Sequence, residues 1–386
     1  MATATDTHAL RRHATLPEIA VGACELDWSR TDADCFLSVL HGMNTDGGNR
    51  VRPLNILCSS TRQWNPGDEW IALGIRRLFR TLYPARVLNW LLYDRSPDCF
   101  LEPWVKSARR PDLLGNSYQP AEELPAVDLV VMAGTPEWLG PHLEPLARIS
   151  HTSAAPVFYL GIDYPSTELP CSPDDVRMLS KALIVTRGAM ARQGLEALGI
   201  QARMLPCPAL FASPFEYPAR ALKNIGIVLQ SDRVPNQAVS TELKARMLGM
   251  LPMLQPRFSI KIVCNYIDEY LEFSPSLDCP VCYSYDSDEY FRLLSDCDMV
   301  ISTRLHSALI ANSLLKPAIM TNTEPRVCSA VELCPYIFVR EPEDVPAFLE
   351  RFEPDPVTRN LFNWKRNQEA QYLEVLRGAL QEHGLY

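Results

Sequence analysis

The stretch D-M-V-I-S-T-R-L-H-S-A-L-I-A-N-S-L-L-K-P-A-I-M-T-N, residues 298–322, decides the fold of this chain. It begins with a short apolar run at Met299–Ile301, which has the length of a buried strand. Apolar residues then recur at helical spacing from Leu305 until Pro317, which cannot continue a helix. A second apolar run, Ala318–Met320, follows. Because strand, helix and strand form the repeating unit of a parallel sheet, the stretch predicts an α/β fold.

Polar residues gather at the turn between the first of these strands and the helix. Ser302 and Thr303 offer hydroxyls that can cap the helix. Arg304 can grip a phosphate or carboxylate with two parallel hydrogen bonds, and His306 can exchange a proton near neutral pH. Ligands of an open parallel sheet bind at the carboxyl ends of strands, where helix N-termini attract anions. This position favours a ligand-binding role over an ion-paired surface arginine and a packed core histidine.

The segment S-T-R-L-H-S-A-L-I-A at residues 302–311, followed by K-P-A-I at 316–319, resembles the signature of the polysaccharide pyruvyl transferase family. Enzymes of this family move the enolpyruvyl unit of phosphoenolpyruvate onto sugar hydroxyls, usually as a cyclic ketal. The resemblance implies that His306 is the general acid and that Arg304 clamps the anionic donor.

A partial match to the same family follows the first predicted strand, Leu54–Cys58. The residues N-P-G-D at 65–68 open an amphipathic helix expected over 69–79, and Asp68 is placed to cap it. In the family such a motif lines the acceptor side of the cleft. The resemblance therefore implies that Asn65 and Gly67 bind substrate and that Asp68 takes part in catalysis.

The loop after the predicted strand Asp128–Ala133 reads G-T-P-E-W at residues 134–138. Family members tend to have more glycine here. An aromatic ring beside a carboxylate can hold a sugar, which gives Trp138 a binding role and Glu137 a role as acceptor base. Trp138 as a filler of the domain interface is an equally good interpretation.

A second arginine stands at a predicted strand end, because the strand Ala182–Val185 leads into Thr186 and Arg187. This resembles a family strand that ends in arginine, so the resemblance implies that Arg187 is a second anion clamp. Cys207-Pro208-Ala209-Leu210 stands where the family commonly has an element like D-P-A-F.

The order of the predicted elements gives two Rossmann-like domains that face a cleft, the arrangement called GT-B-like. The proline-containing segment 213–223 is the expected linker. We expect an N-terminal extension at 1–50 with one short helix near 32–40, an acceptor-side domain at 51–215, a phosphoenolpyruvate-side domain at 216–350 and a C-terminal helix that packs back on the body within 351–386.

The composition of the 386 residues excludes several classes of protein. A net charge of −9 argues against nucleic-acid binding through a broad basic surface. No apolar run approaches the roughly 18 residues of a transmembrane helix, and no secretory signal is visible, so a cytoplasmic location is expected. The 12 cysteines are then expected to be free thiols. Cys279 and Cys282 form a single C-x-x-C, which falls short of a zinc site, so no metal is expected.

These observations predict a pyruvyl transferase with phosphoenolpyruvate as donor, a sugar or glycan as acceptor, and no cofactor. Neither predicted domain has the G-x-G-x-x-G or P-loop motif of dinucleotide and nucleotide enzymes. The alternatives are a GT-B glycosyltransferase that uses a nucleotide-sugar and a non-catalytic relative. The expected catalytic residues are His306, Asp68 and Glu137. The expected substrate-binding residues are Arg304, Arg187, Asn65, Gly67, Ser302, Thr303, Leu305, Ser307 and Trp138.

Overall fold

The computed structural model of the protein describes residues 52–61, 66–94, 118–119, 126–134, 154–230, 240–284, 286–321, 333, 335 and 337–386. All of them belong to one compact unit, Arg52–Tyr386. The expected N-terminal extension, with its short helix near 32–40, lies outside the described residues.

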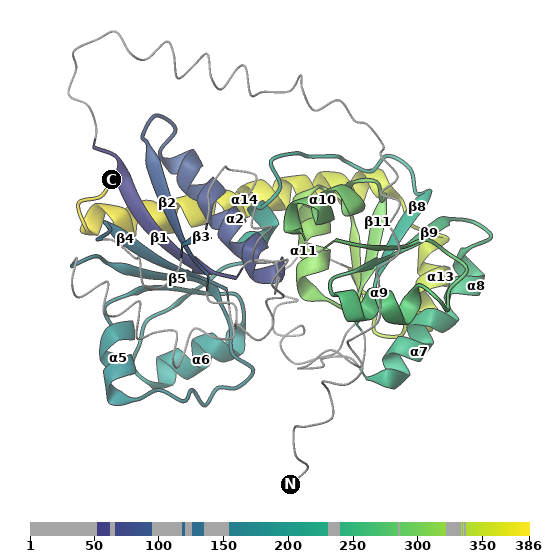
Figure 1. The fold of residues 1–386 in the computed structure, drawn as a ribbon, viewed down its shortest axis with the longest axis horizontal. Coiled ribbons are helices and arrows are strands. Elements are labelled where there is room, and N and C mark those ends of the chain that lie inside the picture. The colour runs from purple at the N-terminus through teal and green to yellow at the C-terminus, as the bar shows by residue number, and fades with distance from the viewer. Residues whose placement is uncertain are drawn as a thin grey trace, which may run out of the picture. The chain divides into compact units, whose positions relative to one another are not determined.

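The first sheet has seven parallel strands in the order β3-β2-β1-β4-β5-β6-β7 (Figure 1). The strands are β1 (Leu54–Ser60), β2 (Leu88–Asp94), β3 (Tyr118–Gln119), β4 (Leu129–Ala133), β5 (Val157–Ile162), β6 (Leu183–Thr186) and β7 (Arg203–Met204). The helices of this part are α2 (Pro66–Leu82), α5 (Pro173–Leu179), α6 (Ala189–Ala197) and the short η4 (Pro208–Phe211).

The second sheet has six parallel strands in the order β10-β9-β8-β11-β12-β13 (Figure 1). The strands are β8 (Asn224–Val228), β9 (Ser259–Cys264), β10 (Val281–Tyr283), β11 (Met299–Ser302), β12 (Ala318–Met320) and β13 (Ile337–Phe338). The helices of this part are α7 (Thr241–Gly249), α8 (Leu251–Leu254), α9 (Ile267–Phe273), α10 (Ser287–Ser295), α11 (Leu305–Ser313), η5 (Pro342–Asp344) and α13 (Val345–Leu349).

Both sheets have the strand order of a Rossmann fold, in which the chain builds outward first on one side of its first strand and then on the other. The direction reverses between β1 and β4 in the first sheet and between β8 and β11 in the second. Ligands of such sheets bind at the carboxyl ends of the strands beside this reversal. The predicted fold class, α/β with two Rossmann-like domains in a GT-B-like arrangement, is confirmed. The domain boundaries stay a prediction.

Residues 298–322 fold as expected into β11, α11 and β12. The predicted capping of two helices, α2 by Asp68 and α11 by Ser302 or Thr303, is wrong. Helix α2 begins at Pro66, so Asp68 lies inside its first turn and does not cap it from outside. Proline is favoured at the first helical position, because its missing N–H would have no partner there. Arg304 precedes the first helical residue of α11, and no side chain caps that end. Ser302 Oγ accepts a hydrogen bond from the Arg304 backbone N–H at 2.9 Å instead.

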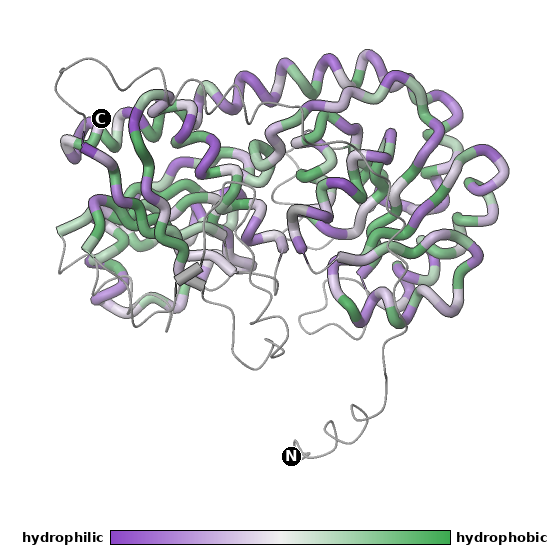
Figure 2. The backbone as a smooth tube through the Cα atoms, turned by 45° about the horizontal axis from the view of Figure 1, so that its top comes forward, coloured by the Kyte–Doolittle hydropathy of each residue, from purple (hydrophilic) through white to green (hydrophobic). Residues whose placement is uncertain are grey.

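The C-terminal helix expected within 351–386 is α14 (Pro354–Glu382), and it contacts both Rossmann-like halves. The Tyr372 hydroxyl donates to the Pro206 carbonyl at 2.7 Å, and Lys365 Nζ donates to the Ser313 carbonyl at 2.8 Å. Figure 2 shows the strands as mostly hydrophobic, whereas α14 alternates between hydrophilic and hydrophobic residues. The hydrophobic face of α14 includes Leu376 and Leu380, which are fully buried.

Candidate active site

Residues from both sheets meet where the strands end. Arg187 directly follows β6, and His306 is the second residue of α11, directly after the turn that follows β11. Arg187 Nη1 lies 2.5 Å from His306 Nε2. The predicted histidine and one of the two predicted arginines therefore lie together, although 119 positions separate them in the chain.

Helix α2 approaches His306 from the first sheet. A Cβ added at Gly67 would lie 2.1 Å from His306 Nδ1 and 2.8 Å from its Cε1. Real Cβ atoms essentially never come within 3.0 Å of another heavy atom, so only glycine fits here without a shift. The N-P-G-D motif thus has a steric reason for its glycine, and substrate binding by Gly67 stays a prediction.

Arg187 is buried among negative and polarisable groups. Its Nε lies 3.8 Å from Asp163 Oδ2, and its Nη1 donates to Cys207 Sγ at 3.8 Å. Burial lowers the pKa of Arg187, but its neighbours raise that pKa by more. Those neighbours are Cys207, Asp163 and Asp68. Burial also raises the pKa of the Cys207 thiol, which is therefore neutral near neutral pH, so the carboxylates supply the negative charge.

Arg304 is held by a buried carboxylate that sequence analysis missed. The Glu269 side chain is fully buried, and Arg304 Nη2 donates to its Oε1. Glu269 Oε2 also accepts hydrogen bonds from the backbone N–H groups of Asn265 (2.7 Å) and Tyr266 (3.2 Å). The Arg304 guanidinium stands 4.9 Å from the centre of the Tyr266 ring, a cation–π contact. Burial lowers the pKa of Arg304, but Glu269, Tyr266 and Tyr290 together raise that pKa by more.

A buried hydrogen-bond network supports the residue after His306. The Tyr290 hydroxyl lies 3.0 Å from Ser307 Oγ and donates to Asn265 Oδ1 at 2.5 Å. Ser307 Oγ also donates to Asn265 Oδ1 at 3.2 Å. Burial raises the pKa of Tyr290 far above its ordinary value, so its hydroxyl stays protonated. The network fixes the first turn of α11, and with it the direction in which His306 leaves the helix.

Asp68 lies in the first turn of α2, beside Gly67, and is fully buried. Its backbone carbonyl accepts from Ser60 Oγ at 3.0 Å. The Asp68 carboxylate raises the pKa of both Arg187 and Tyr266, with burial the larger cause of the shift in Tyr266. Asp68 is therefore close to groups from both halves of the structure.

The remaining predicted site residues fall into two groups. Asn65, Glu137 and Trp138 lie outside the described residues. Ser302, Thr303, Leu305 and Ser307 are buried at the turn and in the first turn of α11. Thr303 Oγ1, for example, donates to the Val228 carbonyl at 3.4 Å. These side chains shape the turn that presents Arg304 and His306, and their contact with substrate stays a prediction.

Asp163 and Asn265 had a signal in the sequence that the analysis did not use. Each directly follows a strand, β5 and β9 respectively, at the same edge of its sheet as the arginines. Like Arg187 and Arg304, they therefore lie where ligands of a parallel sheet bind. Glu269 has no such signal, because it lies inside α9, 35 positions from Arg304.

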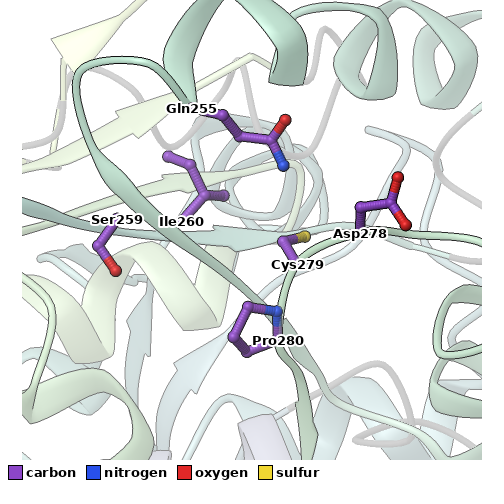
Figure 3. Close-up of a pocket in the computed structure, with 6 residues that line it drawn as sticks. All are labelled: Gln255, Ser259, Ile260, Asp278, Cys279 and Pro280. Atoms are coloured by element: carbon purple, nitrogen blue, oxygen red, sulfur yellow. The ribbon is translucent and has the colours of Figure 1, made fainter.

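The surface pocket drawn in Figure 3 lies at the end of the second sheet opposite to His306. It has a volume of about 400 Å³. Its lining residues are Gln255, Ser259, Ile260, Asp278, Cys279 and Pro280. Ser259 is the first residue of β9, so the pocket is at the amino end of the strands, away from His306.

A metal site is still a matter of prediction. Within the described ranges, no group of three His, Cys, Asp or Glu side chains is placed to hold a metal ion. Burial raises the thiol pKa of both Cys279 and Cys282.

Among the residues that the structure describes, no helix is both long and apolar enough to cross a membrane.

Comparison with protein families gives one match. The family model described as polysaccharide pyruvyl transferase matches residues 65–325, which include α2, Arg187, Arg304 and His306. None of the curated proteins matches the chain in a sequence search.

Several solved structures resemble the chain at low identity. The UDP-GlcNAc 2-epimerase from Neisseria meningitidis bound to UDP-GlcNAc is 11% identical, with a TM-score of 0.49 over 84% of this chain and 100% of that chain. E. coli heptosyltransferase WaaC with ADP-2-deoxy-2-fluoro heptose is 12% identical, with a TM-score of 0.47 over 77% of this chain and 99% of that chain. The UDP-N-acetylglucosamine 2-epimerase from Rickettsia bellii is 11% identical, with a TM-score of 0.48 over 85% and 97%. At these values the likenesses do not indicate what this chain binds.

Proposed function

Because the chain belongs to the polysaccharide pyruvyl transferase family, we propose that it transfers the pyruvyl group of phosphoenolpyruvate onto hydroxyls of a sugar or glycan precursor. The observation that carries the proposal is the convergence of His306, Arg187 and Arg304 at strand ends of two sheets. Phosphoenolpyruvate has a carboxylate and a phosphate, and it reacts by accepting a proton. A proton carrier beside two arginines suits both properties.

We propose that the donor is bound by the two arginines and by the N-terminus of α11. Both guanidinium groups are charged, since nearby carboxylates raise their pKa values. Glu269 engages Nη2 of Arg304, and the guanidinium has further N–H donors for an anion. The N-terminus of α11 has no side-chain cap, so its first backbone N–H groups and the helix dipole also favour a negative ligand.

The proposed reaction begins with proton transfer from His306 to the methylene carbon of the donor. The electron pair of the C=C bond forms the new C–H bond, and C2 becomes electrophilic. An acceptor hydroxyl attacks C2 and gives its proton to a carboxylate. The C2–O bond to phosphate then breaks, phosphate leaves with the electron pair, and a second hydroxyl closes the ketal and loses its proton. General acid catalysis of this kind contributes about 10²–10⁴-fold.

Asp68 is the proposed base for the acceptor hydroxyl among the described residues. It sits in the first turn of α2, next to the glycine that contacts His306. Its carboxylate acts on the pKa of Arg187 from the first half and of Tyr266 from the second. This position suits a group that receives a proton at the junction of donor and acceptor. Glu137, the other predicted base, lies outside the described residues.

Ligand-dependent thermal unfolding tests the proposed donor. At a phosphoenolpyruvate concentration about 100-fold above Kd, binding stabilises the native state by about 2.7 kcal/mol and raises Tm by several °C. Nucleotide-sugars and free sugars, tested alongside, represent the glycosyltransferase and the non-catalytic alternative. The Tm increase is expected to shrink to about a third or less in Arg304→Ala. It is expected to persist in Arg246→Ala, because Arg246, on α7, pairs with Glu341 and Glu343 at η5. A Tm increase with a nucleotide-sugar and none with phosphoenolpyruvate contradicts the proposal.

A further inference from the structure

The contact between Arg187 and His306 fixes the protonation state of the histidine for as long as the contact is made. Arg187 Nη1 lies 2.5 Å from His306 Nε2. A guanidinium has only N–H donors and stays protonated in proteins, so Nε2 must be the acceptor. An imidazole that accepts at Nε2 carries no proton there and is neutral. The same histidine, as the proposed general acid, has to be charged when it reacts.

Arg187 places a positive charge directly beside the imidazole of His306. Arg187 is in direct contact with it, whereas Arg304, two residues earlier in the chain, donates to Glu269. Among the described residues, the titratable groups on or next to the surrounding elements are Asp68 and Glu69 on α2, Asp163 after β5, Arg187 after β6, Cys207 before η4, Tyr266 at the start of α9, Glu269 on α9, Tyr290 on α10 and Arg304 before α11. The carboxylates near Arg187 are Asp163, at 3.8 Å, and Asp68. In this arrangement the positive charge of Arg187 is turned directly on the imidazole.

We propose that donor binding and protonation of His306 are coupled through Arg187. The donor anion replaces the imidazole as the partner of Arg187 Nη1, and the released Nε2 takes up a proton from water. The proton then faces an anion instead of a cation. The acid is therefore charged only when the donor is present. This inference rests on the proposed function and adds a residue that controls the general acid.

The coupling has a measurable consequence. A donor that binds with uptake of one proton binds about tenfold more weakly for each pH unit above the range in which the free imidazole titrates, by thermodynamic linkage. The second ionisation of a phosphate monoester also lies near pH 6. About two pH units higher, the phosphate of the free donor is already fully ionised. Proton uptake measured at that pH is therefore assigned to the protein and not to the donor.

Titration calorimetry of the full chain with phosphoenolpyruvate, in two buffers of different ionisation enthalpy, counts the protons. The wild type is expected to take up close to one proton per donor. His306→Gln is expected to bind the donor with uptake near zero. His383→Gln is the matched control, because His383 is exposed near the end of α14, and its uptake is expected to equal that of the wild type.

A second measurement needs no donor and no variant. Nitrogen NMR of the ligand-free protein near neutral pH is expected to show His306 as the neutral tautomer protonated at Nδ1. A charged His306 in the ligand-free protein overturns the proposal. Donor binding without proton uptake, or uptake that survives in His306→Gln, also overturns it and leaves the proposed function intact. Failure of phosphoenolpyruvate to bind at all refutes the proposed function, and the coupling with it.

Discussion

Replacement of Gly67 by alanine tests whether His306 is held in one position by helix α2. The added Cβ would lie 2.1 Å from His306 Nδ1, well inside the 3.0 Å that real Cβ atoms respect. The imidazole or the first turn of α2 must therefore shift by about 1 Å. A displacement of that size at a catalytic group costs about 10²-fold in rate, so kcat in Gly67→Ala is expected to fall about that far.

The same substitution has a smaller effect on stability. Overpacking by one methyl group typically costs about 1–3 kcal/mol, and here the imidazole can partly relieve it by leaving Arg187. Phosphate release gives kcat, and thermal unfolding gives stability. Gly249→Ala is the control, because a Cβ at Gly249, at the end of α7, meets nothing within 4 Å. Wild-type kcat in Gly67→Ala refutes the reasoning, since the imidazole would then have room that the structure denies it.

Three further outcomes are expected. Arg304→Ala is expected to weaken phosphoenolpyruvate binding by about 2–5 kcal/mol. Arg304→Lys is expected to recover little of this affinity, because an ammonium group cannot replace the forked guanidinium that also reaches Glu269. Unchanged affinity of Arg304→Ala in calorimetry refutes the role of Arg304 in binding the donor. Leu376 is fully buried on α14, so Leu376→Ala is expected to lower the free energy of unfolding by about 2–5 kcal/mol in denaturant titrations. The KM for the donor is expected to stay unchanged, and a changed KM would show that α14 influences donor binding. Turnover is expected to survive thorough chelation, and elemental analysis is expected to find less than one zinc per chain. One zinc per chain, with loss of the fold on chelation, would instead support a zinc site at Cys279 and Cys282.

The deciding stretch was predictable because its signals are local. The apolar runs that became β11 and β12 and the proline that ends α11 act on their own neighbours in the chain. The strand β2, Leu88–Asp94, was not predicted. Its residues L-N-W-L-L-Y-D do not alternate regularly between apolar and polar. The strand is set by pairing with β1, from Leu54 to Ser60, which is a tertiary property.

The site could be predicted only where a residue's place in the sheet reveals its role. Arg187 and Arg304 were found because they end predicted strands, and His306 because it follows one of them. Glu269 could not be found, because only folding brings α9 against the turn before α11. The contact between Gly67 and His306 likewise joins residues far apart in the chain. Sequence patterns thus pointed to the two arginines and the histidine, whereas the groups that hold them in place required the structure.

Transfer of the pyruvyl group in heavy water tests the central claim most directly. If an exchangeable acid protonates the methylene carbon of phosphoenolpyruvate, the methyl group of the product acquires deuterium, which mass spectrometry and NMR detect. His306→Gln is expected to bind phosphoenolpyruvate with near-normal affinity, and its turnover is expected to fall by about 10²-fold or more. A product whose methyl group carries no deuterium, or a His306→Gln variant with full turnover, contradicts the account.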